Sequence, residues 1–324
     1  MSNPSIDGDR GARARSTPGQ ATEANSQWVA AWTALIERQP HLRHPEPAAL
    51  ALHIPEAGLM ALRCGQDSTR LKGRVADWLS PIAQWGTVAL TVRNGLGAAT
   101  VVCDVRSVSL DGDTLSLRGD QEHLLISCRA AVHGFLYEDR TAPGAMHSLH
   151  LYDPAGQVLL RVQLLHEAGA RAALPHLLAH ADFSASKGWR AGSIGSEAVG
   201  GFPGWCAIVS TLNRMEAARR AMVTAVGSCA DQPRMRLVLE GKAAALNYAG
   251  PVLGTLQAAM PADAPRCVFS ARTTTANHAF VCLAPDNVPY LRFHDGESGT
   301  VTLWPQTTPE LAQAWVDAAV ASSR

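Results

Sequence analysis

The strongest constraint on the fold is a run of alternating apolar and polar residues between Gly86 and Leu165. Side chains of a strand point alternately to its two faces, so this pattern predicts strands with one buried face. The dipeptides Asn94-Gly95 and Asp111-Gly112 interrupt the alternation where type I′ hairpin turns fit, because both central residues of such a turn need positive φ. The run therefore predicts an antiparallel meander, and other elements have to cover at least one of its faces.

Part of this pattern occurs a second time near the end of the chain. The first copy contains His133-Gly134-Phe135 followed by Asp153 and Gly156, and the second contains His278-Ala279-Phe280 followed by Asp295 and Gly299. We interpret the two copies as an internal duplication, whose domain-sized period predicts two similar domains rather than a solenoid. The expected fold class is α+β, with two similar halves that each consist of a long antiparallel meander sheet flanked by helices.

Composition divides the chain into four parts. Residues 1–26 contain almost no large apolar side chains, which predicts a disordered tail. Residues 27–183 form the N-terminal half. Residues 184–204 are rich in Gly and Ser and predict a flexible linker. Residues 205–324 then form a diverged C-terminal half.

Helical patterns flank the strands. We expect helices around residues 28–36, 45–52, 55–62 and 75–79, and a helix over Ala168–His180 with a break at Pro175. In the second half we expect a helix over Thr211–Val226 that places Met215 and Met222 in the core. A last helix begins at Thr308 and turns Leu311, Trp315 and Ala318 inward.

Charge and composition exclude several classes of function. The 28 basic and 28 acidic residues cancel, so no basic surplus indicates nucleic-acid binding. No apolar run approaches the roughly 20 residues that span a bilayer, and the first residues contain no signal-peptide core. Seven scattered cysteines without a C-x-x-C motif predict reduced thiols, and therefore a cytoplasmic protein.

Several motifs follow one another in an order that a known family shares. They are Ile54, Glu56, Ala57 and Leu59; Arg93-Asn94; His133-Gly134-Phe135; Ser148-Leu149 with Asp153 and Gly156; and, in the second half, Gly241-Lys242 and Tyr248-Ala249-Gly250-Pro251-Val252. In this respect the chain resembles the bacterial HemS/ChuS/HmuS hemin-utilisation proteins and the shorter ChuX/HutX proteins. The resemblance implies a cytoplasmic protein that binds heme for iron acquisition and either transfers it or helps to degrade it.

The chain departs from the family at the positions that hold heme. In typical members an axial His of the second half, a distal Arg of the first half, and a Lys, an Arg and a Tyr of the C-terminal strands surround the heme. The matching positions here are Gly201, Leu125, Ala284 and Trp304. The resemblance therefore implies heme at a non-standard site, and it leaves open whether the chain is a heme-degrading enzyme. The alternative is a paralogue that has lost heme and acts as a binding or regulatory module.

Three residues are candidates for binding the cofactor at such a site. Tyr and Cys also hold heme iron in proteins, which directs attention to Tyr248 and to Cys206 beside the changed axial position. His133 is the third, although its repetition at His278 favours a structural role. The expected partner is heme or another planar apolar ligand, and the oligomeric state is not determined.

Other chemistry has little support in the sequence. His176 and His180, at i and i+4 of an expected helix, could hold a divalent metal, but no third ligand is evident. We identify no catalytic residue, because nucleophile and phosphate-loop motifs are both absent.

Overall fold

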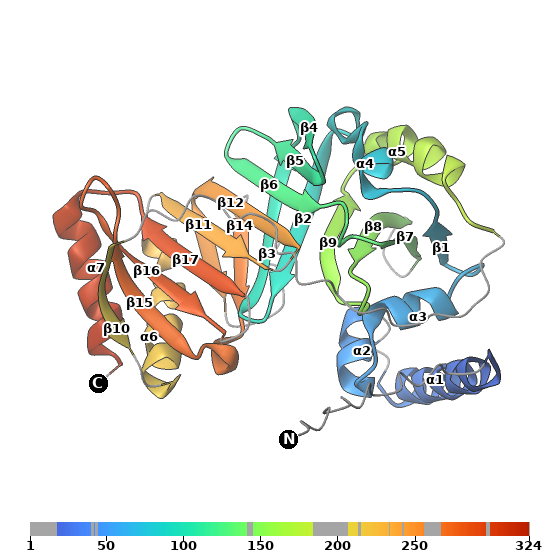
Figure 1. Cartoon of the computed structure of the whole chain (residues 1–324), viewed down its shortest axis with the longest axis horizontal. Coiled ribbons are helices and arrows are strands. Elements are labelled where there is room, and N and C mark those ends of the chain that lie inside the picture. Colours follow the sequence, from blue (N-terminus) through green and yellow to red (C-terminus); the bar gives the residue numbers. More distant parts are fainter. Residues whose placement is uncertain are drawn as a thin grey trace, which may run out of the picture.

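Two large sheets flanked by helices make up the computed structural model of the chain (Figure 1). The structure describes residues 18–39, 42, 45–140, 145–183, 207–212, 215–232, 234–241, 243–255, 267–295 and 299–323. The predicted linker, residues 184–204, and the first 17 residues of the predicted tail lie outside the described residues.

The sheets, which we name sheet I and sheet II, are antiparallel apart from one parallel pair, β13 with β14. Sheet I has the order β1 (Ser68–Leu71), β7 (His133–Asp139), β8 (Met146–Tyr152), β9 (Val158–Leu164), β2 (Thr87–Asn94), β3 (Gly97–Asp104), β14 (Cys267–Ala271) and β13 (Val252–Thr255). Sheet II has the order β10 (Ala207–Leu212), β15 (His278–Leu283), β16 (Pro289–His294), β17 (Thr300–Pro305), β11 (Met235–Glu240), β12 (Ala244–Gly250), β6 (Glu122–Ser127), β5 (Thr114–Arg118) and β4 (Ser107–Asp111).

The strand orders show that the two halves are similar and that they exchange strands. The order β1-β7-β8-β9-β2-β3 in sheet I matches β10-β15-β16-β17-β11-β12 in sheet II. Beyond this shared part, β14 and β13 of the second half extend sheet I, while β6, β5 and β4 of the first half extend sheet II. The predicted α+β class with two similar halves is confirmed, but each sheet contains strands from both halves.

The repeated Asp positions form the same turn in both halves. The Asp153 N–H donates to the carbonyl of Gln157, and Asp153 Oδ1 accepts the N–H of Gln157 at 2.9 Å. Asp295 makes the same two bonds with Gly299, and its Oδ1 accepts at 3.0 Å. This equivalence supports the predicted duplication at the level of single hydrogen bonds.

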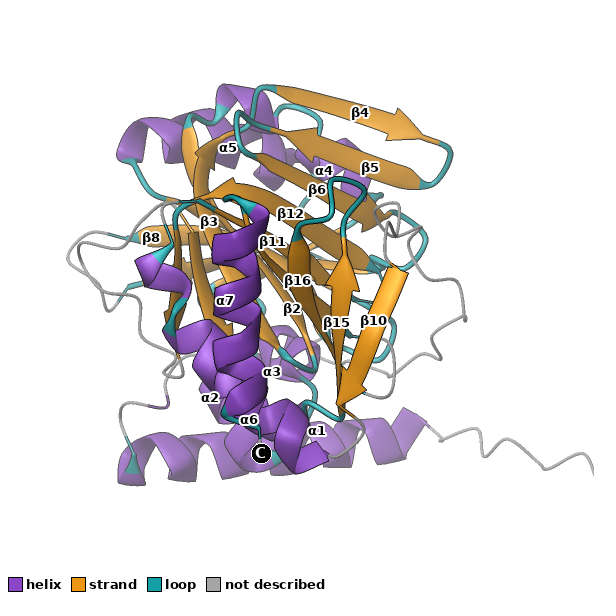
Figure 2. Cartoon of the chain, turned by 90° about the vertical axis from the view of Figure 1, so that its left-hand side faces the viewer, coloured by secondary structure: helices purple, strands orange, loops and turns teal. Residues whose placement is uncertain are grey.

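A single hydrophobic core joins the two sheets. It contains alternate side chains of both sheets, for example Leu149 and Leu151 from β8 and Leu237 and Leu239 from β11. We call the sheet surfaces that face this core the core faces, and the opposite surfaces the outer faces. Helices α6 (Met215–Gly227) and α7 (Pro309–Ala321) lie over sheet II in Figure 2 and pack on its core face.

The first half has additional helices on the other side of its sheet. Helices α4 (Val75–Leu79) and α5 (Glu167–Ala179) pack on the shared core. Helices α1 (Pro18–Arg38), α2 (Pro45–Leu52) and α3 (Glu56–Leu62) form a separate group (Figure 1). Ala57, Met60 and Ala61 of α3 pack on Phe135 and Tyr152, which belong to the outer face of sheet I.

Several local predictions of the helices are corrected. Helix α1 begins at Pro18, so the backbone of residues 18–26 is helical and not part of a disordered tail. Helix α5 continues through Pro175, because its packed face of Gly169, Ala173 and Leu177 outweighs the missing N–H.

In the second half, the start of α6 and the buried side of α7 differ from the prediction. Helix α6 begins at Met215, which is exposed, since Thr211 and Leu212 pair with β15 as part of β10; Met222 is buried as expected. Helix α7 begins after Thr308 as predicted. Trp315 is buried, but Leu311 and Ala318 are exposed because the buried stripe runs through Ala312, Trp315, Val316 and Ala319.

Both predicted hairpins exist, but neither has the predicted type I′ turn. Gly112 has a φ of 55°, whereas Asp111 has no positive φ and pairs with Thr114 as the last residue of β4, so the turn is centred one residue later than predicted. Neither Asn94 nor Gly95 has positive φ, and Asn94 pairs with Gly97, so the type I′ prediction is wrong there. Asn94 Oδ1 accepts the N–H of Leu96 at 2.8 Å and closes the turn with its side chain.

The side chain of Asn94 also joins the two halves. Its Nδ2 donates to the carbonyl of Glu240 at 2.8 Å and to that of Thr300 at 3.0 Å. These carbonyls lie at an end of β11 and of β17, so one amide group of the first half satisfies two backbone acceptors of the second. The β2–β3 turn is thereby fixed against sheet II.

We predict that Asn94→Ala lowers the free energy of unfolding by about 2–4 kcal/mol, because two half-buried carbonyls and two turn N–H groups lose their partners. Urea unfolding followed by circular dichroism measures the change. Gln313→Ala, which removes an exposed amide on α7, is the matched control and should stay within about 0.5 kcal/mol of the wild type. Equal stability of the two variants would contradict the role of Asn94.

Candidate ligand-binding face

Two positions that the family uses for heme lie on the same surface of the structure. Leu125 is on β6 and Trp304 is on β17, and the register of the strands between them puts both side chains on the outer face of sheet II. Ala284, the third such position, follows β15 and packs with Tyr290 and Trp304. The changed positions therefore identify one face, to which both halves contribute strands.

A row of stacked side chains crosses this face. Tyr290 on β16 stacks on Trp304, with ring centroids 5.4 Å apart and ring planes at 26°. The guanidinium of Arg236 on β11 lies 5.4 Å from the centroid of Trp304, directly across the strand pair. The Nε–H of Arg236 donates to Asn247 Oδ1 on β12 at 3.2 Å. The row is thus an aromatic surface with an oriented cation at one end.

None of the described residues accepts a hydrogen bond from the indole N–H of Trp304. Its Nε1 is shielded from solvent and makes no hydrogen bond to a described residue. A buried donor of this kind costs about 1–3 kcal/mol, and in native proteins it calls for an explanation such as a water, an ion or a ligand. The indole N–H is therefore a donor of the row that no described residue satisfies.

A histidine lies on the same face, on β6, which is one of the three strands that the first half contributes to sheet II. His123 on β6 is opposite Asn247, and its Nε2 is 2.9 Å from Ser116 Oγ on β5. Burial and the charge of Arg118 lower the pKa of His123. The imidazole is therefore neutral at pH 7, which is the form that can bind iron.

The charged groups in the middle of the face are balanced within the sheet. Arg292 on β16 makes an ion pair of 2.9 Å with Glu240 on β11, and the hydroxyl of Thr300 donates to the same carboxylate oxygen at 2.7 Å. Arg292 therefore finds its carboxylate on a neighbouring strand of the sheet rather than on a covering helix.

The three residues selected from the sequence are at different places. Tyr248 is fully buried on the core face of sheet II, and its hydroxyl donates to Gln121 Oε1 at 3.1 Å, so it would have to leave the core to reach a ligand. His133 is on the outer face of sheet I, where burial and Arg70 lower its pKa. Cys206 lies outside the described residues.

Among the described residues, α6 packs directly on the core face of sheet II and leaves no cleft for a planar ligand there. Ala218, Ala221 and Met222 of α6 are fully buried against the core face of the sheet. A planar ligand would have to displace this packed core. Only the outer face of sheet II combines the changed family positions with the stacked row.

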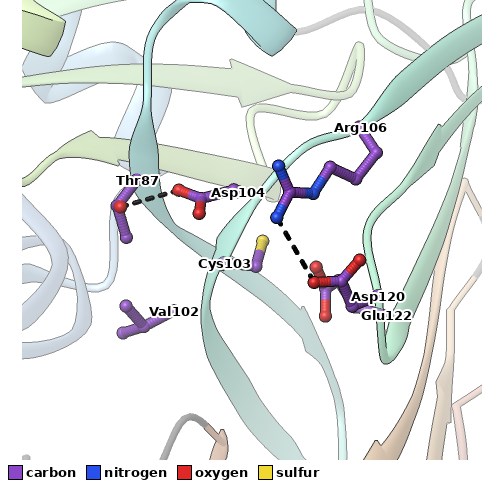
Figure 3. Close-up of a pocket in the computed structure, with 7 residues that line it drawn as sticks. All are labelled: Thr87, Val102, Cys103, Asp104, Arg106, Asp120 and Glu122. Carbon is purple, nitrogen blue, oxygen red and sulfur yellow. Dashed lines mark hydrogen bonds and ion pairs between the residues drawn. The ribbon is translucent and has the colours of Figure 1, made fainter.

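A cavity of about 190 Å³ lies elsewhere, between the ends of β2 and β3 and the start of β6 (Figure 3). Thr87 donates to Asp104 at 2.7 Å and Arg106 pairs with Asp120 at 3.4 Å, so its polar groups satisfy one another. Ligand pockets usually measure roughly 300–1,000 Å³ and are mostly apolar. This cavity is too small and too polar for heme.

The pair of histidines on α5 does not have the features of a metal site. His176 Nε2 is 2.9 Å from the carbonyl of Asp77, and because a carbonyl only accepts, this nitrogen donates. His180 stacks edge-on against His176. Within the part of the chain that the structure describes, no group of three or more His, Cys, Asp or Glu side chains could hold a metal ion.

The outer face of sheet I is built differently, because the covering helices supply its charges. Arg93 on β2 pairs with Glu46 of α2 and with Glu56 of α3. The Tyr152 hydroxyl donates to Glu56 Oε1 at 3.0 Å, and His150 Nδ1 lies 3.6 Å from the same oxygen. This buried cluster locks α2 and α3 onto the sheet.

Burial controls the ionisation of the cluster. It lowers the pKa of His150 to about 4. It acts to raise the pKa of Glu56, but the interaction with His150 and the charge of Arg93 outweigh it, so that the pKa is lowered. At neutral pH the cluster therefore contains a neutral imidazole beside a carboxylate.

Sequence reasoning missed Arg236, Asn247 and His123. None of them belongs to a motif that carries the resemblance. The alternation in β11 does place Arg236 and Val238 on one side of a strand, but it does not say which side faces the helices.

The comparisons with known proteins agree with this fold. Residues 53–180 match the family described as the haemin-degrading HemS.ChuX domain. The heme degrading enzyme ChuS of Escherichia coli O157:H7 has 18% sequence identity and a TM-score of 0.68, over 92% of this chain and 99% of ChuS. Holo-PhuS, a heme-binding protein from Pseudomonas aeruginosa, has 17% identity and a TM-score of 0.70, over 90% of this chain and 98% of PhuS.

The matches show a shared fold and a family match over part of the chain. Residues 53–180 match the HemS.ChuX domain, which supports a relationship to the HemS/ChuS family, and the chain has the two-sheet fold of ChuS and PhuS. None of the curated protein sequences compared with the chain matches it. No helix among the described residues is long and apolar enough to cross a membrane.

We predict that the protein loses stability as the pH falls from about 6.5 to about 4. The folded pKa of His150 is about 4 against an ordinary value of 6.5, so between these values only the unfolded chain takes up the proton. The stabilisation that comes from this pKa difference is fully present above pH 6.5. Acidification to below pH 4 removes it, which lowers the free energy of unfolding by up to ~3 kcal/mol. Urea unfolding near pH 7.5 and near pH 4.5 measures the loss.

A comparison of variants separates the effect of His150 titration on stability from the effect of the carboxylates, which titrate in the same pH range. His150→Gln removes the titrating group, so its loss of stability on acidification should be smaller than that of the wild type. His278→Gln, at an exposed histidine, should behave as the wild type does. The account of the cluster fails if His150→Gln and wild type lose the same stability.

Proposed function

We propose that the chain binds heme against the outer face of sheet II and serves in heme utilisation. The observation that carries this proposal is the stacked pair of Tyr290 and Trp304, an apolar aromatic cluster on the face to which the resemblance assigns the ligand. The HemS.ChuX domain match supports it, as do the printed descriptions of ChuS and PhuS as heme proteins.

The same face offers one group for the iron, since His123 supplies a neutral imidazole from β6. Cys206, which lies outside the described residues, is the second candidate and would bind iron as a thiolate. Heme, when bound, would contribute an iron centre that accepts either ligand. Tyr248 and His133, which lie on other faces, would bind heme only at a separate place.

We further propose that the chain binds and transfers heme rather than opening its ring. Ring opening needs iron with an open face that is supported towards oxygen, and the family's distal Arg is Leu125 here. A leucine cannot donate a hydrogen bond to an oxygen ligand. Iron acquisition and a cytoplasmic location are part of the same proposal.

We expect a hemin titration of the purified protein, followed at the Soret band, to saturate at a single site. His123→Ala or Cys206→Ala should shift the band, because replacing an axial ligand changes the iron spectrum. Tyr248→Phe and His133→Ala should keep the wild-type spectrum and affinity within about threefold. These two are controls for general damage to the fold.

Each alternative has a distinct result. A band shift in Tyr248→Phe or His133→Ala alone would move the site to the core or to sheet I. Slow, non-saturating adsorption that is the same in all variants would overturn heme binding and would leave a HemS-fold module with another ligand.

A further inference from the structure

We infer that α1, α2 and α3 form a cover that opens from the outer face of sheet I as one unit, and that the buried cluster around Glu56 is the acid-sensitive latch of this cover. The closed cover shields the outer face of sheet I from solvent, and acidification opens it before the sheets unfold. This device is independent of heme binding at sheet II.

The three helices have an apolar core of their own. Trp32 of α1 packs there with Ala49 of α2 and Leu59 of α3, and this core is separate from the core between the sheets. The ring of Trp28 on α1 also lies against Gly58 of α3, where a Cβ would be 2.6 Å from the ring. Because the helices bury these side chains against one another, they stay together when they leave the sheet.

Little apolar surface attaches the cover to the sheet. The fully buried side chains of α3 in this contact are Ala57, Met60 and Ala61, and two of these three are single methyl groups. One backbone hydrogen bond is added, from the Ala57 N–H to the carbonyl of Gly156 at 3.3 Å. Because stability comes mainly from buried apolar area, this contact is weaker than the packing between the sheets.

Charged groups make the rest of the attachment. Arg93 of β2 pairs with Glu46 of α2 and, at 3.4 Å, with Glu56 of α3, and the Tyr152 hydroxyl donates to Glu56 as well. Removal of buried charges from water costs most of the free energy that their attraction provides, so such a cluster fixes a geometry but adds little net stability. We therefore expect the cover to open at a lower free-energy cost than the sheets.

The closed cluster keeps its histidine neutral. The titratable and charged groups around His150 are Glu46 of α2, Glu56 of α3, Arg93 of β2, Tyr137 of β7, Tyr152 of β8 and Arg161 of β9. Burial raises the pKa of both tyrosines, which keeps them neutral, and the two arginines stay cationic. Burial also lowers the pKa of His150 to about 4, so the closed state excludes a proton from the imidazole at neutral pH.

Opening of the cover removes this restriction. Solvent returns the pKa of His150 to its ordinary value of 6.5, so between pH 6.5 and pH 4 the open state takes up a proton that the closed state does not. The opening equilibrium then rises about tenfold for each pH unit of acidification. Despite its burial, Glu56 has a lowered pKa because His150 and Arg93 interact with its carboxylate, so below the ordinary value of 4.5 its protonation favours opening as well.

Hydrogen exchange of the whole chain, followed by mass spectrometry at urea concentrations below the unfolding transition, tests the device. We expect the amides of α2 and α3 to share one protection factor at pH 7.5, at least about tenfold below that of β11 and less dependent on urea. Between pH 7.5 and pH 4.5 this factor should fall about thirty- to a hundredfold. His150→Gln keeps a donor for Glu56 and should reduce the fall to about threefold or less. His278→Gln, at an exposed histidine, should retain the full fall.

A second variant shows whether the helices open together. Glu46→Gln weakens the latch at a half-exposed carboxylate of α2, and it should lower the protection of α3 as much as that of α2, about two- to fivefold at pH 7.5. Glu37→Gln, at an exposed carboxylate of α1, is the matched control and should leave both unchanged. A fall confined to α2 would contradict opening as one unit.

Two further results would overturn the inference. If α2 and α3 have the protection of β11 at every urea concentration, the cover opens only when the whole protein unfolds. If acidification lowers the protection of α2 and α3 equally in the wild type and in His150→Gln, the cluster is not an acid-sensitive latch.

Discussion

The exchange of strands between the two halves is the constraint on which the rest of the molecule depends. Asn94 joins the two halves where the β2–β3 turn meets sheet II. Its amide donates to carbonyls of Glu240 and Thr300, so the first half completes the hydrogen bonding of the second. Because β6 belongs to sheet II, His123 and Leu125 share a face with residues more than a hundred positions away. The candidate ligand face therefore cannot form from the second half alone.

The two halves use the same strand order for different purposes. On sheet I, Arg93 is neutralised by Glu46 and Glu56 of the covering helices, which ties the cover to the sheet. On sheet II, Glu240 occupies the position of Arg93 and pairs with Arg292 within the sheet. A face that balances its own charge needs no helical partner for that purpose. Duplication followed by such changes has left one half whose outer face takes its charges from covering helices and one half whose outer face balances a charge within the sheet.

Local pattern predicted the strands, the hairpin at Gly112 and the start of the last helix, because each depends on neighbouring residues. The exchange of β6 and β14 was not predictable, since pairing between distant strands leaves no local signal. The same limit explains Tyr248 and Arg236: alternation shows which residues share a side, but tertiary packing decides which side meets the core. The break expected at Pro175 was wrong because packing outweighed the local cost. The resemblance indicated the family and the changed positions, but it could not point to a candidate ligand such as His123, which belongs to none of the shared motifs.

The most direct test of this account is a map of where hemin lies. Ferric hemin broadens the NMR signals of nearby protons, so a titration of the deuterated protein locates it without any substitution. We predict selective broadening of the Trp304 indole N–H and of the amides around Val238 and His123 on the outer face of sheet II. Broadening centred on His133 and sheet I, or uniform broadening without a site, would contradict the central claim.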